Sequence, residues 1–93
     1  MHLFKFHVSL ESDNFHSGDD ALDELYRLMA QPNEDLGFDY TIEGYEYLGT
    51  FDSPSHVYEV LIGAEDLDAA NEVMESQLFA ETKPGLVVKY AIV

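Results

Sequence analysis

HVYEVLIGAEDLDAANEVMESQLFA, residues 56–80, decides the fold because the period of its apolar pattern changes partway along. Over 56–63 apolar side chains alternate, as in a β-strand that is buried on one side. One face of that strand consists of Tyr58, Val60 and Ile62. From 64 to 80 the apolar spacing becomes that of a helix. The helical stripe consists of Leu67, Ala70, Met74 and Leu78. The stretch therefore predicts a strand followed directly by a helix.

The first part of the chain shows the same change of period. Residues 2–11 alternate, and one face consists of Phe4, Phe6, Val8 and Leu10. A turn-forming segment, 12–18, contains Ser17, which with Asp20 forms a variant of the helix capping box. The helix that follows is predicted to end near Ala30, because Pro32 disfavours helical backbone before it. Its apolar stripe consists of Leu22, Leu25, Tyr26 and Met29.

Two further strands complete the pattern. The strand predicted over 39–51 changes its alternating phase around Gly44, which indicates a β-bulge. Residues 52–55 form a turn between this strand and the one at 56–63. Pro84 and Gly85 form another turn, before a last strand over 86–93. One side of that last strand consists of Leu86, Val88, Tyr90 and Ile92.

The predicted order is βαββαβ, a single α+β domain over residues 1–93. Right-handed crossovers then give a four-stranded antiparallel sheet in the order 4-1-3-2, with both helices on one face. This arrangement resembles the ferredoxin-like superfold over essentially the whole chain. The resemblance implies a topology and no particular function. The predicted core consists of Phe4, Phe6, Val8, Leu22, Leu25, Met29, Val60, Ile62, Leu67, Met74, Val88 and Tyr90.

The charge of the chain is strongly one-sided. Nineteen acidic residues stand against four Lys and Arg, which gives a formal net charge of -15. Direct binding of nucleic acid or of an anionic membrane needs clustered Lys and Arg, so we expect neither. Cysteine is absent, which excludes disulfides and thiolate chemistry. The sequence has no long apolar run of a signal peptide or membrane span, so we expect a cytoplasmic protein.

An acidic helix surface is the first candidate site. It consists of Asp19, Asp20, Asp23, Glu24, Glu65, Asp66, Asp68, Glu72 and Glu75. Acids in a first helical turn complement the helix dipole, which accounts for the early positions but poorly for Asp23, Glu72 and Glu75. Arg27 is the only basic residue on either predicted helix, so these carboxylates have few cations to pair with. Carboxylates along two parallel helices could imitate rows of phosphates.

By size and charge the chain resembles small acidic phage-type inhibitors, the DNA-mimicking anti-restriction and anti-CRISPR proteins. That resemblance implies a partner with a basic nucleic-acid groove, which the acidic helix surface would occupy in place of DNA or RNA. Electrostatic complementarity would speed the association and make it sensitive to salt.

The open face of the predicted sheet is the second candidate site. It consists of Leu3, Lys5, His7, Tyr45, Tyr47, Val57, Glu59, Leu61, Val87, Lys89, Ala91 and Val93. This face is more apolar than one side of an antiparallel sheet should leave in water. We expect a second copy of the chain to cover it, with a protein partner or a small ligand as alternatives. Lys5 and Lys89 either neutralise Glu59 or form an anion site with His7.

We expect neither a metal ion nor another cofactor. Two loops gather acids, one with Asp13, His16, Asp19 and Asp20, the other with Glu34, Asp35 and Asp39. Their spacing does not fit an EF-hand, so solvated acids are the simpler interpretation. The four histidines show no paired metal spacing, and no nucleophile elbow or phosphate-binding glycine loop is present. We therefore expect a binding protein rather than an enzyme.

Three functional hypotheses remain. The first is an acidic inhibitor or decoy of a nucleic-acid-processing protein. The second is an ordinary domain of a halophile, in which acids serve hydration. The third is a dimeric ferredoxin-like domain, from a halophile or another bacterium, that binds a small ligand on its open sheet face. Salt separates the first two, because a halophile domain should unfold in dilute buffer and a decoy should stay folded there.

Overall fold

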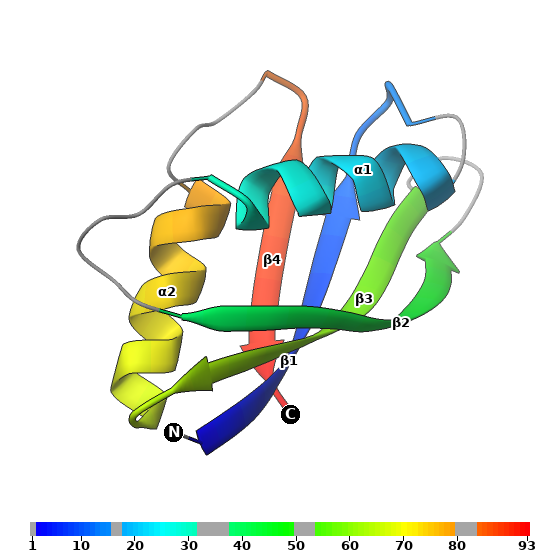
Figure 1. Cartoon of the computed structure of the whole chain (residues 1–93). Helices are drawn as coiled ribbons and strands as arrows, with labels where there is room; N and C mark the ends of the chain where they lie inside the picture. Colours follow the sequence, from blue (N-terminus) through cyan, green and yellow to red (C-terminus); the bar gives the residue numbers. More distant parts are fainter. Residues whose placement is uncertain (1, 16–17, 32–37, 50–53, 80–83) are drawn as a thin grey trace.

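The computed structural model describes residues 2–15, 18–31, 38–49, 54–79 and 84–93 (Figure 1). The element order is βαββαβ, as predicted. The elements are β1 (His2–Glu11), α1 (Gly18–Met29), β2 (Asp39–Gly49), β3 (Pro54–Ala64), α2 (Leu67–Phe79) and β4 (Val87–Ile92).

The four strands form one antiparallel sheet in the order β2-β3-β1-β4, which is the predicted order read from the other edge. The two central strands pair closely, with Phe6 opposite Val60 and His7 opposite Glu59. Because side chains alternate across a strand, this register assigns each residue to one of two faces. The predicted bulge is confirmed, since the β2–β3 register shifts between Ile42 and Gly44.

A single core lies between the sheet and the two helices. Buried residues of β1 and β3 and of both helices belong to one cluster, so α1 and α2 cover the same face of the sheet. Most of the predicted core is confirmed. The predicted residues that are fully buried are Phe6, Val8, Leu25, Met29, Val60, Ile62 and Met74. Those that are partly buried against the cluster are Phe4, Leu22, Val88 and Tyr90.

Two predictions about the helix stripes are wrong. Leu67 is 39% exposed and Tyr26 is 44% exposed. Strand β3 continues to Ala64, so α2 starts only at Leu67, where Asp66 Oδ1 accepts a hydrogen bond from Ala69 N–H at 2.8 Å. Leu67 therefore lies at the outer end of α2. The inward residues of α2 are Ala70, Val73, Met74, Gln77 and Leu78. Those of α1 are Ala21, Leu25, Leu28 and Met29, a stripe that leaves Tyr26 at its edge.

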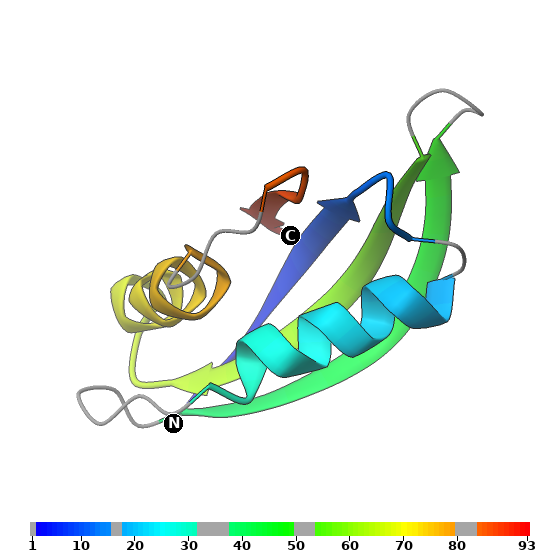
Figure 2. The same ribbon diagram turned by 90° about the horizontal axis from the view of Figure 1, so that it is seen from above.

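The helices meet at their C-terminal ends and do not run parallel. Gln77 of α2 is buried, and its Nε2 donates to the carbonyl oxygens of Leu28, Met29 and Gln31 at 3.2, 3.2 and 2.9 Å. The oxygens of Leu28 and Met29 belong to the last turn of α1, where carbonyls lack partners within the helix, and that of Gln31 lies just after it. Figures 1 and 2 show that α2 crosses the direction of α1 steeply.

The predicted turn before β4 is described by the structure, whereas several other predicted turn and cap residues are not. Gly85 has a φ of 83°, a left-handed conformation that suits glycine, and it precedes β4 as predicted. The predicted cap Ser17, the helix stop at Pro32 and the first half of the turn predicted at 52–55 lie outside the described residues. The second half of that predicted turn is wrong, because β3 already begins at Pro54.

We predict that Phe6→Ala lowers the free energy of unfolding by roughly 3–5 kcal/mol, because Phe6 is fully buried and the substitution leaves a cavity. Urea unfolding followed by circular dichroism measures the change. Leu67→Ala on α2 is the control, since Leu67 is 39% exposed, and it should have little effect. A Phe6→Ala variant as stable as the parent would show that this side of β1 is not the core side.

We also predict that His56 makes stability depend on pH. His56 is 4% exposed, and burial lowers its pKa below the ordinary value of 6.5. As the pH falls below about 6.5, the unfolded chain binds a proton that the folded protein takes up less readily, so the free energy of unfolding falls. The loss levels off once the pH is below the pKa of the folded state.

The test compares unfolding free energies between about pH 5 and pH 7.5 for two single variants. His56→Gln should depend less steeply on pH than the parent. His2→Gln is the control, because His2 is exposed and should leave the parent's slope unchanged. Equal slopes for the parent and His56→Gln would contradict the prediction.

Candidate functional site

The sheet face opposite the helices carries exposed and half-buried apolar side chains between polar ones. Leu3 and Val93 are 71% and 66% exposed at one end of the face, and Val87 is 45% exposed on β4. Val57 and Leu61 are half-buried on the central strand β3. The remaining predicted members Lys5, His7, Lys89 and Ala91 are exposed. The strand registers place those of β1, β3 and β4 on this open sheet face, as the alternation of the sequence predicts. Val93 follows β4, and its N–H donates to the carbonyl oxygen of Lys5 at 3.0 Å, which continues the pairing.

The ionic contact on the open sheet face differs from the one that the sequence suggests. Glu59 lies opposite His7, and its Oε1 is 3.2 Å from His7 Nε2. Lys5 lies opposite Leu61 instead. Glu59 therefore contacts His7 rather than Lys5. A carboxylate beside His7 also opposes an anion there, which weighs against the alternative of an anion site formed by His7 with the two lysines.

The open sheet face carries only a small part of the net negative charge of the chain. Its register includes Lys5 and Lys89, two of the four Lys and Arg residues in the chain. The acidic positions in the same register are Glu11, Asp39, Glu46 and Glu59, four of the nineteen acids. Most of the negative charge of the chain thus belongs to positions outside the open sheet face.

Tyr45 and Tyr47, which we assigned to the open sheet face, follow the bulge. The backbone register sets Tyr45 opposite Tyr58 and Tyr47 opposite His56. Tyr58 and His56 belong to the buried phase of β3. The extra residue of the bulge shifts the phase of β2, so these two positions fall in the register of the helix-covered face. Their side chains lie outside the described residues.

The acids of the helix surface are not equivalent. Asp19, Asp23, Asp68 and Glu72 are exposed on the two helices, and Glu65 precedes α2. Asp20 and Glu24 are half-buried. Glu75 accepts a 2.7 Å hydrogen bond from the hydroxyl of Tyr90. Burial, together with this bond and the nearby charge of Glu75, raises the pKa of Tyr90 to about 12. Because the helices cross steeply, these carboxylates do not form the parallel rows suggested above.

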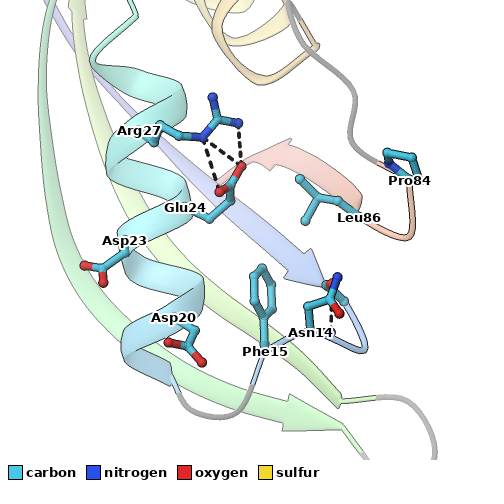
Figure 3. Close-up of a pocket in the computed structure, with 9 residues that line it drawn as sticks. Asn14, Phe15, Asp20, Asp23, Glu24, Arg27, Pro84 and Leu86 are labelled. Carbon is cyan, nitrogen blue, oxygen red and sulfur yellow. Dashed lines mark hydrogen bonds and ion pairs between the residues drawn. The ribbon is translucent and has the colours of Figure 1, made fainter.

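A cavity of about 370 Å³ lies between α1, the segment after β1 and the segment before β4. Figure 3 shows Asp20 and Glu24 on the side of α1 that faces Phe15 and Leu86, whereas Asp23 points away. Arg27 is fixed to Glu24, with Nε at 3.1 and 3.3 Å from the two carboxylate oxygens. This cavity is not among the sites predicted from the sequence.

The sequence did contain one signal for the cavity. Phe15 is an aromatic residue within a polar turn, and its half-buried ring lies 6.0 Å from that of His56. The other walls come from distant parts of the chain, so spacing alone could not bring them together.

Within the part of the chain that the structure describes, no group of three or more His, Cys, Asp or Glu is placed to hold a metal ion. Of the two acidic loops, His16, Glu34 and Asp35 lie outside that part. Among the described helices, none is long and apolar enough to cross a membrane.

No protein-family model and no curated protein matches the chain. A protein described as unknown from Galdieria sulphuraria aligns over 99% of the chain, with 13% identity and a TM-score of 0.54, and the chain spans 46% of it. The aminobenzoyl-glutamate utilization protein from Klebsiella pneumoniae aligns over 97%, with 14% identity and a TM-score of 0.51, and the chain spans 27% of it. At such identities the likeness shows the ferredoxin-like βαββαβ fold alone.

Proposed function

We propose that this chain is an assembly domain, two copies of which associate through their open sheet faces. The observation that carries the proposal is the exposure of Leu3, Val87 and Val93 on that face, beside the half-buried Val57 and Leu61. Apolar surface of this kind is stabilised by removal from water. Two sheets packed face to face interdigitate such side chains at a separation of about 10 Å.

The charge distribution favours a second copy as the occupant. Two chains of net charge -15 repel one another, and the repulsion is smallest where the facing surfaces carry the least net charge. The open sheet face combines Lys5 and Lys89 with Glu11 and Glu59. In a two-fold symmetric pair, a residue of one copy contacts a different residue of the other copy, and the reverse contact occurs as well. The lysines of one face can therefore approach the acids of the other.

The face is also large enough. The molecule measures 40 × 23 × 18 Å along its principal axes. A stable interface buries about 800 Å² from each partner. Four neighbouring strands, about 4.8 Å apart and up to 11 residues long at about 3.3 Å per residue, can supply an area of that order. The helix layers, which hold most of the exposed carboxylates, then lie on the two outer sides of the pair.

We predict that the protein has twice its 10.5 kDa monomer mass by light scattering, and that Leu61→Lys shifts it toward monomer. Leu61 is half-buried in the middle of the open sheet face, and a lysine there would place an unpaired cation in the interface. The substitution also lowers the net negative charge, so general repulsion cannot explain a loss of dimer.

Leu67→Lys is the matched control. It makes the same change at an exposed leucine of α2, on the other side of the molecule, and should leave the dimer intact. A monomeric parent, or equal dissociation of the two variants, would contradict association through the open sheet face.

A second candidate function is that of an acidic decoy for a DNA-processing enzyme. The observation that favours it is that Asp23, Asp68 and Glu72 are exposed. These three residues take no part in the cap contact of Asp66 or the ion pair of Glu24 described above. A basic DNA groove would accept these carboxylates in place of phosphates. Because the two helices cross steeply, their carboxylates do not follow the two phosphate rows of a straight duplex. The partner's groove would need its cations in a correspondingly different arrangement.

We predict for this candidate that the parent inhibits DNA cleavage by a member of a panel of restriction and CRISPR nucleases at low salt. The triple variant Asp23→Asn, Asp68→Asn and Glu72→Gln should lose the inhibition, because it removes charge and keeps shape. The control makes the same three changes at exposed positions elsewhere, at Asp13, Asp39 and Glu43. Equal inhibition by both triple variants, or no inhibition by the parent, would exclude the decoy function.

A further inference from the structure

The cavity beside α1 has an apolar wall on one side. This wall consists of Phe15, Pro84 and Leu86 (Figure 3). The cavity volume of about 370 Å³ lies within the range of small-molecule sites, roughly 300–1,000 Å³. Such sites combine apolar walls with a few polar groups that fix the orientation of the ligand. The chemistry of the ligand therefore depends on which polar groups of the cavity can make a new contact.

The apolar wall is held in place before any ligand arrives. Phe15 N–H donates to the carbonyl oxygen of Ser12 at 3.2 Å, and the Phe15 ring meets His56 edge to face. Gly85, in its left-handed conformation, forms the turn directly before Leu86. Phe15 and Leu86 are both half-buried and pack against the core cluster. A wall that is fixed in this way reduces the entropy lost on binding.

The charged side chains that face the cavity are already engaged within the protein. Arg27 contacts both carboxylate oxygens of Glu24, and the Glu24 side chain is only 13% exposed. Asp20, Glu24 and Arg27 each make a further interaction within the chain. Asp23, also on α1, points away from the cavity (Figure 3). A charged ligand would therefore lose part of its hydration in the cavity without gaining an ion of opposite charge.

Asn14 supplies a polar group that is open to a ligand. Its backbone N–H donates to Ser12 Oγ at 3.1 Å, which holds the residue beside the cavity that it lines. Its side-chain amide is exposed and has no hydrogen-bond partner among the described residues. An amide offers both a donor and an acceptor. Asn14 therefore matches a ligand that carries an amide of its own.

We propose that this cavity binds a small, neutral aromatic amide. The ring of the ligand lies against Phe15 and Leu86, and its amide group exchanges hydrogen bonds with the side chain of Asn14. An aromatic pair adds to the gain from burying apolar surface, which favours a ring over an aliphatic body. The net charge of -15 does not act on a neutral ligand, whereas it repels an anion of the same shape.

The test is a titration of the ¹⁵N-labelled protein with 2-phenylacetamide, followed by the NMR shifts of the backbone N–H groups. We expect saturable shifts around Asn14, Phe15 and Leu86, with a Kd of about 1 mM, a modest affinity for a ligand of this size. Because the ligand is uncharged, the Kd should change by less than about twofold between low salt and roughly 0.5 M salt. The absence of saturable shifts, or shifts centred elsewhere, would overturn the proposal.

Two charged ligands of similar shape test the choice of a neutral group. Phenylacetate replaces the amide of the ligand by a carboxylate, and 2-phenylethylammonium carries a cation at a similar distance from the ring. At roughly 0.5 M salt, where the overall charge of the protein is screened, each ion should bind at least about fivefold more weakly than 2-phenylacetamide. Equal or tighter binding of either ion at this salt concentration would show that the ligand is not neutral.

Two variants test the position of the ligand. Phe15→Leu removes the ring but keeps an apolar side chain, and Asn14→Ala removes the amide, so each should weaken binding of 2-phenylacetamide about threefold to tenfold. The matched controls make the same changes on α2, Phe79→Leu at an exposed position and Asn71→Ala at a half-buried one, and should keep the parent's affinity. The dispersion of the N–H spectrum verifies that each variant is folded. A folded Phe15→Leu or Asn14→Ala variant with the parent's affinity would contradict the assigned position of the ligand.

Discussion

The pairing of β1 with β3 is the constraint on which the other surfaces depend. It sets Phe6 opposite Val60 and Val8 opposite Tyr58, and all four are buried. Because a strand alternates, burying these residues forces Lys5, His7, Glu59 and Leu61 to the opposite face. A register slip of one residue would bury charges and expose the aromatic core, so the composition of the open sheet face follows from the core.

The second constraint is the contact between the helices. Gln77 satisfies carbonyl oxygens in the last turn of α1 from a buried position on α2. The helix ends are therefore held together and the two axes diverge from that point (Figure 2). This divergence separates the acids of α1 from those of α2. The cavity lies beside Phe15 and along α1 from Asp20 to Arg27.

The fold could be predicted from the sequence because burial is recorded directly in the spacing of apolar residues. Alternation marked β1 and β3, and Gly44 marked the bulge. Leu67 was misassigned because its apolar spacing continues the stripe of α2, while the cap at Asp66 places it on the first turn, outside the core. The contacts of Gln77 and the walls of the cavity could not be predicted, since they join residues far apart in the chain.

The pairing of His7 with Glu59 could not be predicted either, because it depends on cross-strand register, which the sequence does not specify to a single residue.

The proposed association through the open sheet face and the cavity beside α1 are compatible with one another in space. Association through the open sheet face would leave the helix side exposed, and the cavity is lined by residues of α1 and of the segments that flank it. Each copy in a pair would then keep its cavity open to solvent. The acidic helix layers would face away from each other, so the arrangement that buries the apolar face also keeps like charges far apart.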